Sequence, residues 1–239
     1  MSVLFFLFIQ QPKGYAKKTI KQPIQAIKPI RPINKMAYSE SSESIKTETI
    51  QKLKEHLALS TINHEKEIMK EITLKNAHIY CVVNNVSAQK YGPLIEKYIR
   101  IKNNFVKNTA SNCNGDCSKD NKNIEIKASL GGSKHNKFNW VQLRVSHDID
   151  YYILTAYYLS SKNVDIGGDL YVFNVPKEDM LNLIAKYGGY AHGTNKEHGI
   201  ITLDNLKDEK NKKEYALRPL YGDKCWMDII KYKVNYETL

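Results

Sequence analysis

The sequence predicts an α/β fold, a central mixed β-sheet flanked by helices, and three segments carry that prediction. Between residues 43 and 75, apolar residues recur with the period of a helix. Residues 124–129 alternate apolar and polar side chains with the period of two that is typical of a strand with one buried face. Residues 167–175 form an apolar run after two glycines, and Pro176 then begins an expected helix over 177–187 with acidic residues in its first turn.

The remaining elements follow along the chain. Residues 78–83 are a short apolar run that fits either a strand or a buried helix. Residues 91–101 predict a helix that starts at the Gly-Pro pair. Residues 138–145 predict a third strand, and the aromatic run 148–159 fits a buried helix or strand. Residues 225–232 predict a closing amphipathic element.

The segment 114–129 predicts a β-hairpin. Its polar run 119–122 has the composition of a turn, with Asp120 and Asn121 as a two-residue loop. In that register Asp116 faces Glu125, and directly opposed Cβ atoms lie about 4.5–5.5 Å apart. Lys127 projects to the same face as Glu125. Two carboxylates and one ammonium are therefore expected to converge at one place.

This group of charges suits the cleavage of a phosphodiester bond. Two close carboxylates repel each other, and a divalent cation relieves the repulsion. We expect Mg²⁺ as cofactor, held by Asp116, Glu125 and the main-chain carbonyl of Ile126, because Mg²⁺ prefers oxygen ligands. Lys127 would orient the attacking water or stabilise charge on the phosphate. The alternative is that Glu125 and Lys127 form an ordinary solvated pair on a strand face.

The Gly-Asp and Ile-Glu-Ile-Lys-Ala-Ser segments of this hairpin resemble the PD-(D/E)xK nuclease superfamily, and type II restriction endonucleases in particular. Gly115, not Pro, precedes Asp116, which departs from the common pattern. The resemblance implies a restriction-endonuclease-like fold and Mg²⁺-dependent hydrolysis of double-stranded DNA at a short site. It also implies a companion DNA methyltransferase. A homodimer with two-fold symmetry, reading a palindrome, is the economical way to cut both strands.

Further candidate residues flank the hairpin. In this superfamily a preceding helix often presents an acidic residue to the metal site, and Glu96 is the candidate here; its alternative is an ion pair with Arg100, four residues on. The segment 142–152 resembles a stretch of restriction-type nucleases in which Gln142 and Arg144 would lie near the DNA backbone. Their alternative is a polar strand edge that faces solvent.

The C-terminal part predicts DNA recognition. The glycine-rich segment 187–199 offers many donors and acceptors that could read base edges in the major groove. A plain surface loop is the alternative. A nuclease of the His-Asn-His type is a further alternative with little support, because no second pair of metal ligands accompanies the histidines of this segment. The candidate DNA-binding residues here are His192, Thr194, Asn195, Lys196 and Arg218.

Charge and composition divide the chain of 239 residues into an arm and one domain. Residues 1–35 contain seven basic residues, four prolines and no acid, so they hold seven of the eleven net positive charges and leave +4 for the rest. They predict either an over-extended start, with translation from Met36, or a disordered basic arm that follows DNA phosphates. We expect 36–239 to form one nuclease domain, with a helical region at 36–75, a catalytic core at 76–185 and a DNA-recognition region at 186–239.

Two rival functions and a location complete the expectations. The rivals are a repair or structure-specific nuclease of the same superfamily and a non-catalytic nucleic-acid-binding module. The apolar run 1–9 is too short to span a bilayer, so no membrane association is expected. Four cysteines without metal-ligand spacing indicate a reduced, intracellular protein, cytoplasmic or of viral origin and acting in a host cell.

Overall fold

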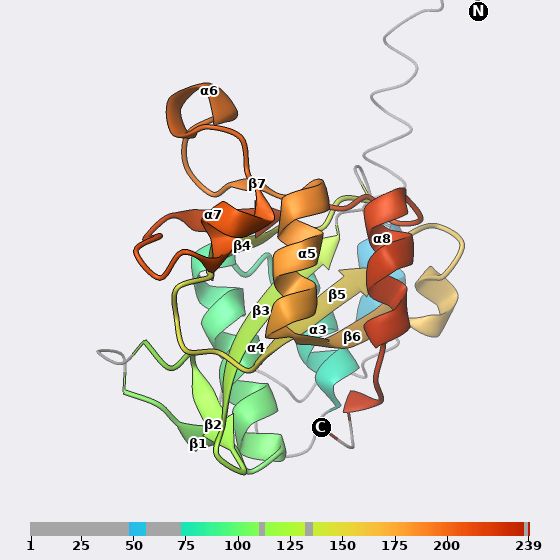
Figure 1. Ribbon diagram of the computed structural model, residues 1–239. Helices are drawn as coiled ribbons and strands as arrows, with labels where there is room; N and C mark the ends of the chain where they lie inside the picture. Colours follow the sequence, from blue (N-terminus) through green and yellow to red (C-terminus); the bar gives the residue numbers. More distant parts are fainter. Residues whose placement is uncertain (1–47, 56–72, 110–112, 132–135, 237–238) are drawn as a thin grey trace, which may run out of the picture.

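The computed structural model describes residues 48–55, 73–109, 113–131, 136–236 and 239. Two β-sheets lie at its centre (Figure 1). The five-stranded sheet has the order β1 (Val106–Lys107), β2 (Cys117–Lys119), β3 (Lys122–Gly131), β5 (Tyr151–Tyr158) and β6 (Asp169–Pro176). The three-stranded sheet has the order β4 (Trp140–Arg144), β8 (Glu214–Leu217) and β7 (Gly189–Tyr190).

The helices flank these sheets. They are α3 (Leu74–Val83), α4 (Ala88–Lys102), α5 (Lys177–Tyr187), α6 (Asn195–His198), α7 (Leu203–Lys207) and α8 (Lys224–Ile229), with short 3-10 helices η2 (Val164–Ile166) and η3 (Ile230–Tyr232). Residues 48–55 are also helical. Strand β3 is parallel to β5, and the other pairs in the central sheet are antiparallel. The predicted α/β fold with a mixed sheet flanked by helices is confirmed, whereas the second sheet was not expected.

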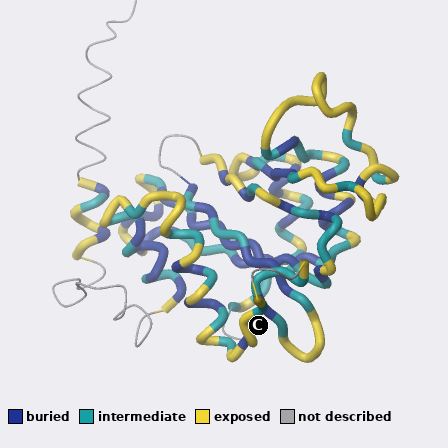
Figure 2. Tube along the Cα trace, turned by 90° about the vertical axis from the view of Figure 1, so that its left-hand side faces the viewer, coloured by how far each residue is buried: buried dark blue, intermediate teal, exposed yellow. Residues whose placement is uncertain are grey.

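The central sheet has a hydrophobic core on each face. Helices α3 and α4 cover one face, where Ile124, Ile126 and Ile153 pack among their apolar residues. On the other face, Leu154 and Phe173 belong to a larger core with α5, α8 and the second sheet. Figure 2 shows the buried chain running through the middle of the molecule, with an exposed loop standing out from it. The sheet is therefore buried on both sides along β5.

That double burial explains the ambiguous run 148–159. The segment forms strand β5, and six of its eight residues are buried. A strand covered on both faces has no polar side to alternate with, so its sequence is a continuous apolar run. The prediction for α5 is confirmed from Lys177 to Tyr187, after Pro176 and with Glu178 and Asp179 in the first turn.

The run 78–83 belongs to helix α3, which begins after the N-cap Thr73, so the helix is the correct one of its two predicted forms. Two other predictions need correction. Helix α4 begins at Ala88, so Pro93 lies inside it and not at its start. The predicted third strand forms β4 but joins the second sheet, because its partner is β8, seventy positions along the chain.

The predicted arm 1–35 and most of the predicted helical region 36–75 lie outside the described residues. Within that region the structure describes residues 48–55 and the start of α3, and both are helical. In the part of the chain that the structure describes, no helix is long and apolar enough to cross a membrane.

Candidate active site

The hairpin of β2 and β3 has the predicted register. Lys119 pairs with Lys122, and Cys117 pairs with Ile124. The two loop residues have positive φ angles, 51° at Asp120 and 61° at Asn121, as a two-residue hairpin turn of the primed type requires. Asn and Asp tolerate this conformation better than most residues.

The ladder ends one pair before the predicted pair of Asp116 and Glu125. The amide of Asp116 donates to the carbonyl of Ile124 at 2.9 Å, although Ile124 already pairs with Cys117. The Oδ2 atom of Asp116 instead accepts a hydrogen bond from the amide of Ile126 at 2.8 Å. Direct opposition of the two carboxylates was therefore wrong, but the side chain of Asp116 still reaches the strand that carries Glu125.

Gly115 makes this turn of the chain possible. Its φ is +71°, and a Cβ at this position would lie 2.6 Å from the carbonyl oxygen of Ile124 and 2.6 Å from Cδ1 of Ile149. Proline has φ fixed near −65° and cannot adopt the conformation of Gly115. The glycine therefore brings the chain to Asp116 by a path that proline could not follow.

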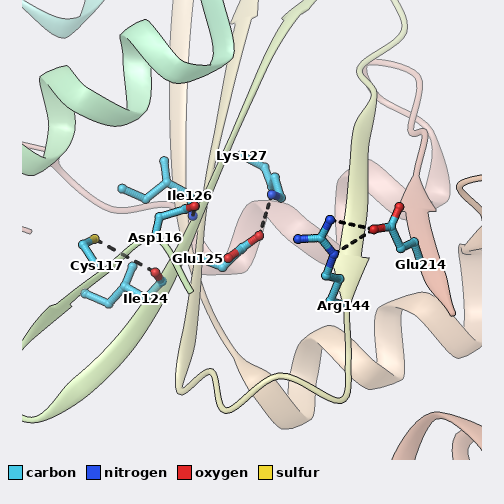
Figure 3. Close-up of polar contacts among 8 residues, drawn as sticks. All are labelled: Asp116, Cys117, Ile124, Glu125, Ile126, Lys127, Arg144 and Glu214. Atoms are coloured by element: carbon cyan, nitrogen blue, oxygen red, sulfur yellow. Dashed lines mark hydrogen bonds and ion pairs between the residues drawn. The ribbon is translucent and has the colours of Figure 1, made fainter. Parts of the chain in front are cut away.

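Glu125 and Lys127 project from the same face of β3 and form an ion pair (Figure 3). Lys127 Nζ lies 2.5 Å from Oε1 of Glu125, and the exposed fractions of the two side chains are 19% and 7%. A pair so far removed from water differs from the solvated surface pair that was the alternative.

Burial and crowding change the acidity of the neighbouring groups. Burial, followed by the nearby charge of Glu125, raises the pKa of Asp116, and Lys127 opposes the rise. Burial, followed by Asp116, raises the pKa of Glu96 to about 7. In the described residues Glu96 has no ion pair with Arg100, which was the alternative role for it. Glu96 therefore belongs electrostatically to the carboxylate group.

A cleft of about 440 Å³ contains this group. Its walls come from the first half of α4, the middle of β3 and strand β4. Seven of the residues predicted from the sequence line it: Glu96, Asp116, Glu125, Ile126, Lys127, Gln142 and Arg144.

A bulge in β4 turns Gln142 toward the cleft. The register between β4 and β8 shifts between Trp140 and Leu143, and the φ of Gln142 is +57°. Trp140 and Leu143 are fully buried in the core, and the two residues between them, Val141 and Gln142, both line the cleft, as Trp140 also does. A strand without a bulge would point these two neighbours to opposite faces. The strain of a left-handed non-glycine residue is thus located at the cleft.

Arg144 is held by a residue that the sequence did not single out. Its Nε and Nη2 atoms both lie 2.7 Å from Oε1 of Glu214 on β8. Figure 3 shows the guanidinium between Glu125 and Glu214, with its third nitrogen directed toward Glu125. Glu214 pairs with Arg144 in the ladder. No local signal could have revealed this, because the pairing depends on two strands that are far apart in sequence.

The remaining predicted DNA-binding residues lie outside the cleft. Thr194 caps helix α6, and its amide and hydroxyl both contact Glu197. Asn195 and Lys196 are exposed on α6, at the end of the protruding loop in Figure 1. Arg218 contacts the carbonyl of Tyr190 through two nitrogens at 3.4 Å.

His192 lies at the start of that loop, and its Nε2 is 3.8 Å from Oε2 of Glu214. The loop therefore begins next to the partner of Arg144.

Comparison of the chain with protein-family models, with curated protein sequences and with solved structures finds no match. The chemistry of the cleft must therefore be argued from its own atoms.

The donor atoms in the cleft fit a hard divalent cation. Within the described residues, the carboxylates of Asp116 and Glu125 each have one oxygen with a bonding partner. Oδ2 of Asp116 accepts from the amide of Ile126, and Oε1 of Glu125 contacts Lys127. The second oxygen of each carboxylate remains available.

The carbonyl of Ile126 faces the same side of β3 as its amide, beyond the end of β2. No group of three or more His, Cys, Asp or Glu side chains in the described residues could hold a metal. Two carboxylates and a carbonyl, with water and substrate oxygens completing the shell, is the arrangement that Mg²⁺ usually accepts.

Proposed function

We propose that this protein is a sequence-specific, Mg²⁺-dependent endonuclease of double-stranded DNA. We also propose that it has the fold of type II restriction enzymes and acts as a homodimer. One observation carries the proposal. The buried pair of Glu125 and Lys127 shares one cleft with Asp116, and the pKa of Asp116 is raised by burial and by Glu125. Two neighbouring carboxylates, one of them with a raised pKa, are a reason to expect a bound cation. The ammonium group beside them is a reason to expect a phosphate.

Each residue has a role in this proposal. Asp116 and Glu125, with the Ile126 carbonyl, would hold the ion. Bound Mg²⁺ would polarise the scissile phosphate and offset the charge that develops on it. Lys127, which forms an ion pair with Glu125, would donate a hydrogen bond that orients the attacking water. Glu96 adds a carboxyl that titrates near neutral pH.

Substrate binding rests on the walls of the cleft. Arg144 presents a guanidinium edge that matches a phosphate, and Gln142 projects an amide beside it. The loop with His192, Asn195 and Lys196 stands out from the body and begins next to Glu214, the partner of Arg144. It would read base edges while the cleft holds the backbone. A second copy of the chain would place a second cleft on the other strand.

The test uses the full chain and a long duplex DNA of phage size. Incubation with Mg²⁺ should give discrete fragments, and incubation with a chelator should give none. Asp116→Asn and Lys127→Met should abolish cleavage. Asp120→Asn is the matched control, since it replaces a carboxylate of the same hairpin in its exposed turn, where asparagine suits the positive φ.

The other outcomes separate the rival functions. A smear of fragments would favour a repair or structure-specific nuclease. Binding of DNA without cleavage across several metals, unchanged in Asp116→Asn, would favour the non-catalytic binding module and overturn the enzyme.

A further inference from the structure

The cleft contains a basic residue whose orientation is set by a carboxylate from another strand. Arg144 projects from β4, and Glu214 projects from its partner β8. One oxygen of Glu214 accepts hydrogen bonds from two guanidinium nitrogens, Nε and Nη2, each at 2.7 Å. Hydrogen bonds between charged groups in this fork geometry fix direction as well as distance.

The guanidinium keeps one edge for a ligand. Among the described residues, Nη1 of Arg144 has no hydrogen-bond partner, and Figure 3 shows it on the side of Glu125. The Arg144 side chain is 42% exposed, and the residue lines the cleft. The Glu214 side chain is 23% exposed, so solvent competes for it less than for a surface carboxylate. An oxygen of a phosphodiester that entered the cleft would meet Nη1 with little rearrangement of the side chain.

We infer that Glu214 is a positioning residue: it holds the Arg144 guanidinium so that Nη1 receives a phosphate of the bound DNA. This inference rests on the proposed function. It adds a specific claim, namely that Glu214 acts on phosphate binding through Arg144 and not through His192, whose Nε2 lies 3.8 Å from its other oxygen. Without Glu214, the long side chain of Arg144 would sample other rotamers, and binding would have to order it again.

A double-mutant cycle in the full chain tests this claim. Its members are the wild type, Glu214→Gln, Arg144→Gln and the double variant. The first readout is the Kd for a fluorescent duplex in the presence of a chelator. The second is the split of cleavage into KM and kcat with Mg²⁺. Asp228→Asn is the matched control, because Asp228 forms a similar ion pair with Lys186 on α5, away from the cleft.

Glu214→Gln should raise Kd and KM about tenfold while kcat changes little, as expected for a contact made equally before and during the reaction. In the Arg144→Gln background, the same substitution should have no further effect. An equal loss in both backgrounds would overturn the inference. Tighter binding by Glu214→Gln would also overturn it, because Glu214 would then compete with the phosphate.

A measurement on the free protein separates this inference from the proposed function. The Nε–H resonance of Arg144, assigned by its absence from Arg144→Gln, should be sharp in the wild type and broadened in Glu214→Gln. Adding a thymidine dinucleotide phosphodiester should shift it in the wild type. If the wild type shows this shift but never cleaves DNA, the nuclease proposal fails and the positioning role stands. An unchanged resonance in Glu214→Gln would remove the positioning role even in an active nuclease.

Discussion

The carboxylate of Asp116 accepts a hydrogen bond from the main-chain amide of Ile126, at the point where β2 has ended and β3 continues. A side chain thus takes the place that a neighbouring strand would have filled. The hydrogen bond fixes Oδ2 of Asp116 against the backbone of β3 and leaves Oδ1 available to a ligand. It also ties the aspartate to the residue between Glu125 and Lys127, so this bond fixes Asp116 relative to the ion pair.

Replacing Asp116 by asparagine should remove the response to Mg²⁺ without lowering the stability of the metal-free protein. The pKa of Asp116 is raised in the folded state, chiefly by burial and then by Glu125, so its ionised form is disfavoured by folding above the unfolded pKa of about 4. Asparagine removes that cost and can still accept from Ile126. Mg²⁺ at ten times its Kd should stabilise the wild type by about 1.4 kcal/mol, measured by thermal unfolding. A Mg²⁺ shift of equal size in Asp116→Asn would show that the ion binds elsewhere, and Asp120→Asn should keep the wild-type shift.

Gly115→Ala should destabilise the protein by more than the conformational strain alone. A left-handed conformation costs a non-glycine residue about 1–2 kcal/mol. The new Cβ would also lie 2.6 Å from the Ile124 carbonyl and from Cδ1 of Ile149. Gly222→Ala provides the comparison, since its φ is +82° and nothing lies within 4 Å of its Cβ position. Chemical denaturation should give a clearly larger loss for Gly115→Ala, and equal losses would contradict the packing argument.

Gln142→Gly should raise stability and lower activity. Glycine adopts the φ of +57° without strain, so the free energy of unfolding should rise by about 1 kcal/mol. The amide that lines the cleft is lost, so cleavage or DNA affinity should fall. Gln142→Asn keeps an amide in a residue type that tolerates this conformation and should retain more activity. Full activity in Gln142→Gly would mean that the side chain contacts no substrate.

The stability contributed by His78 should decline between pH 6.5 and pH 4, while Glu96, whose pKa burial raises to about 7, contributes in the opposite sense over the same range. The side chain of His78 is fully buried in α3, where Nδ1 donates to the carbonyl of Leu74 and Nε2 accepts from the hydroxyl of Thr155. Burial lowers its pKa to about 4 from an ordinary value of 6.5. The neutral form is therefore favoured by folding: its contribution is complete above pH 6.5 and is lost as the pH falls to about 4.

This difference in pKa corresponds to about 3 kcal/mol. Unfolding by urea at several pH values should show the decline as the difference between the wild type and His78→Gln, because the carboxyl groups of the cleft are present in both proteins. His192→Gln should follow the wild-type profile, because the side chain of His192 is 83% exposed. Profiles of the same shape for the wild type and His78→Gln would contradict the prediction.

Local patterns were sufficient for the hairpin and for α5. The turn residues Asp120 and Asn121 determine the register of β2 and β3, and Pro176 marks the start of α5. Both signals act between residues that are close in sequence. Of the seven predicted residues that line the cleft, Asp116, Glu125, Ile126 and Lys127 were predicted from the hairpin, whereas Glu96, Gln142 and Arg144 were predicted from the resemblance to nucleases.

The second sheet and its consequences could not be predicted in this way. The pairing of β4 with β8 joins Arg144 to Glu214 across a long stretch of chain. The bulge at Gln142 has no sequence signature, since glutamine is not a residue typical of positive φ. Helix α4 begins upstream of Pro93, at Ala88, although its N-cap residue Ser87 makes no side-chain capping hydrogen bond that would mark the start.

The end of β2 before Ile126 also gives the site a built-in reporter. Within the described residues, the amide proton of Ile126 is shielded from exchange with water by the Asp116 carboxylate and not by a strand. Its exchange rate therefore follows the state of that one side chain, while the amide of Ile124 is protected by the ladder. Exchange at these two positions of one strand distinguishes a change at the carboxylate from an opening of the hairpin.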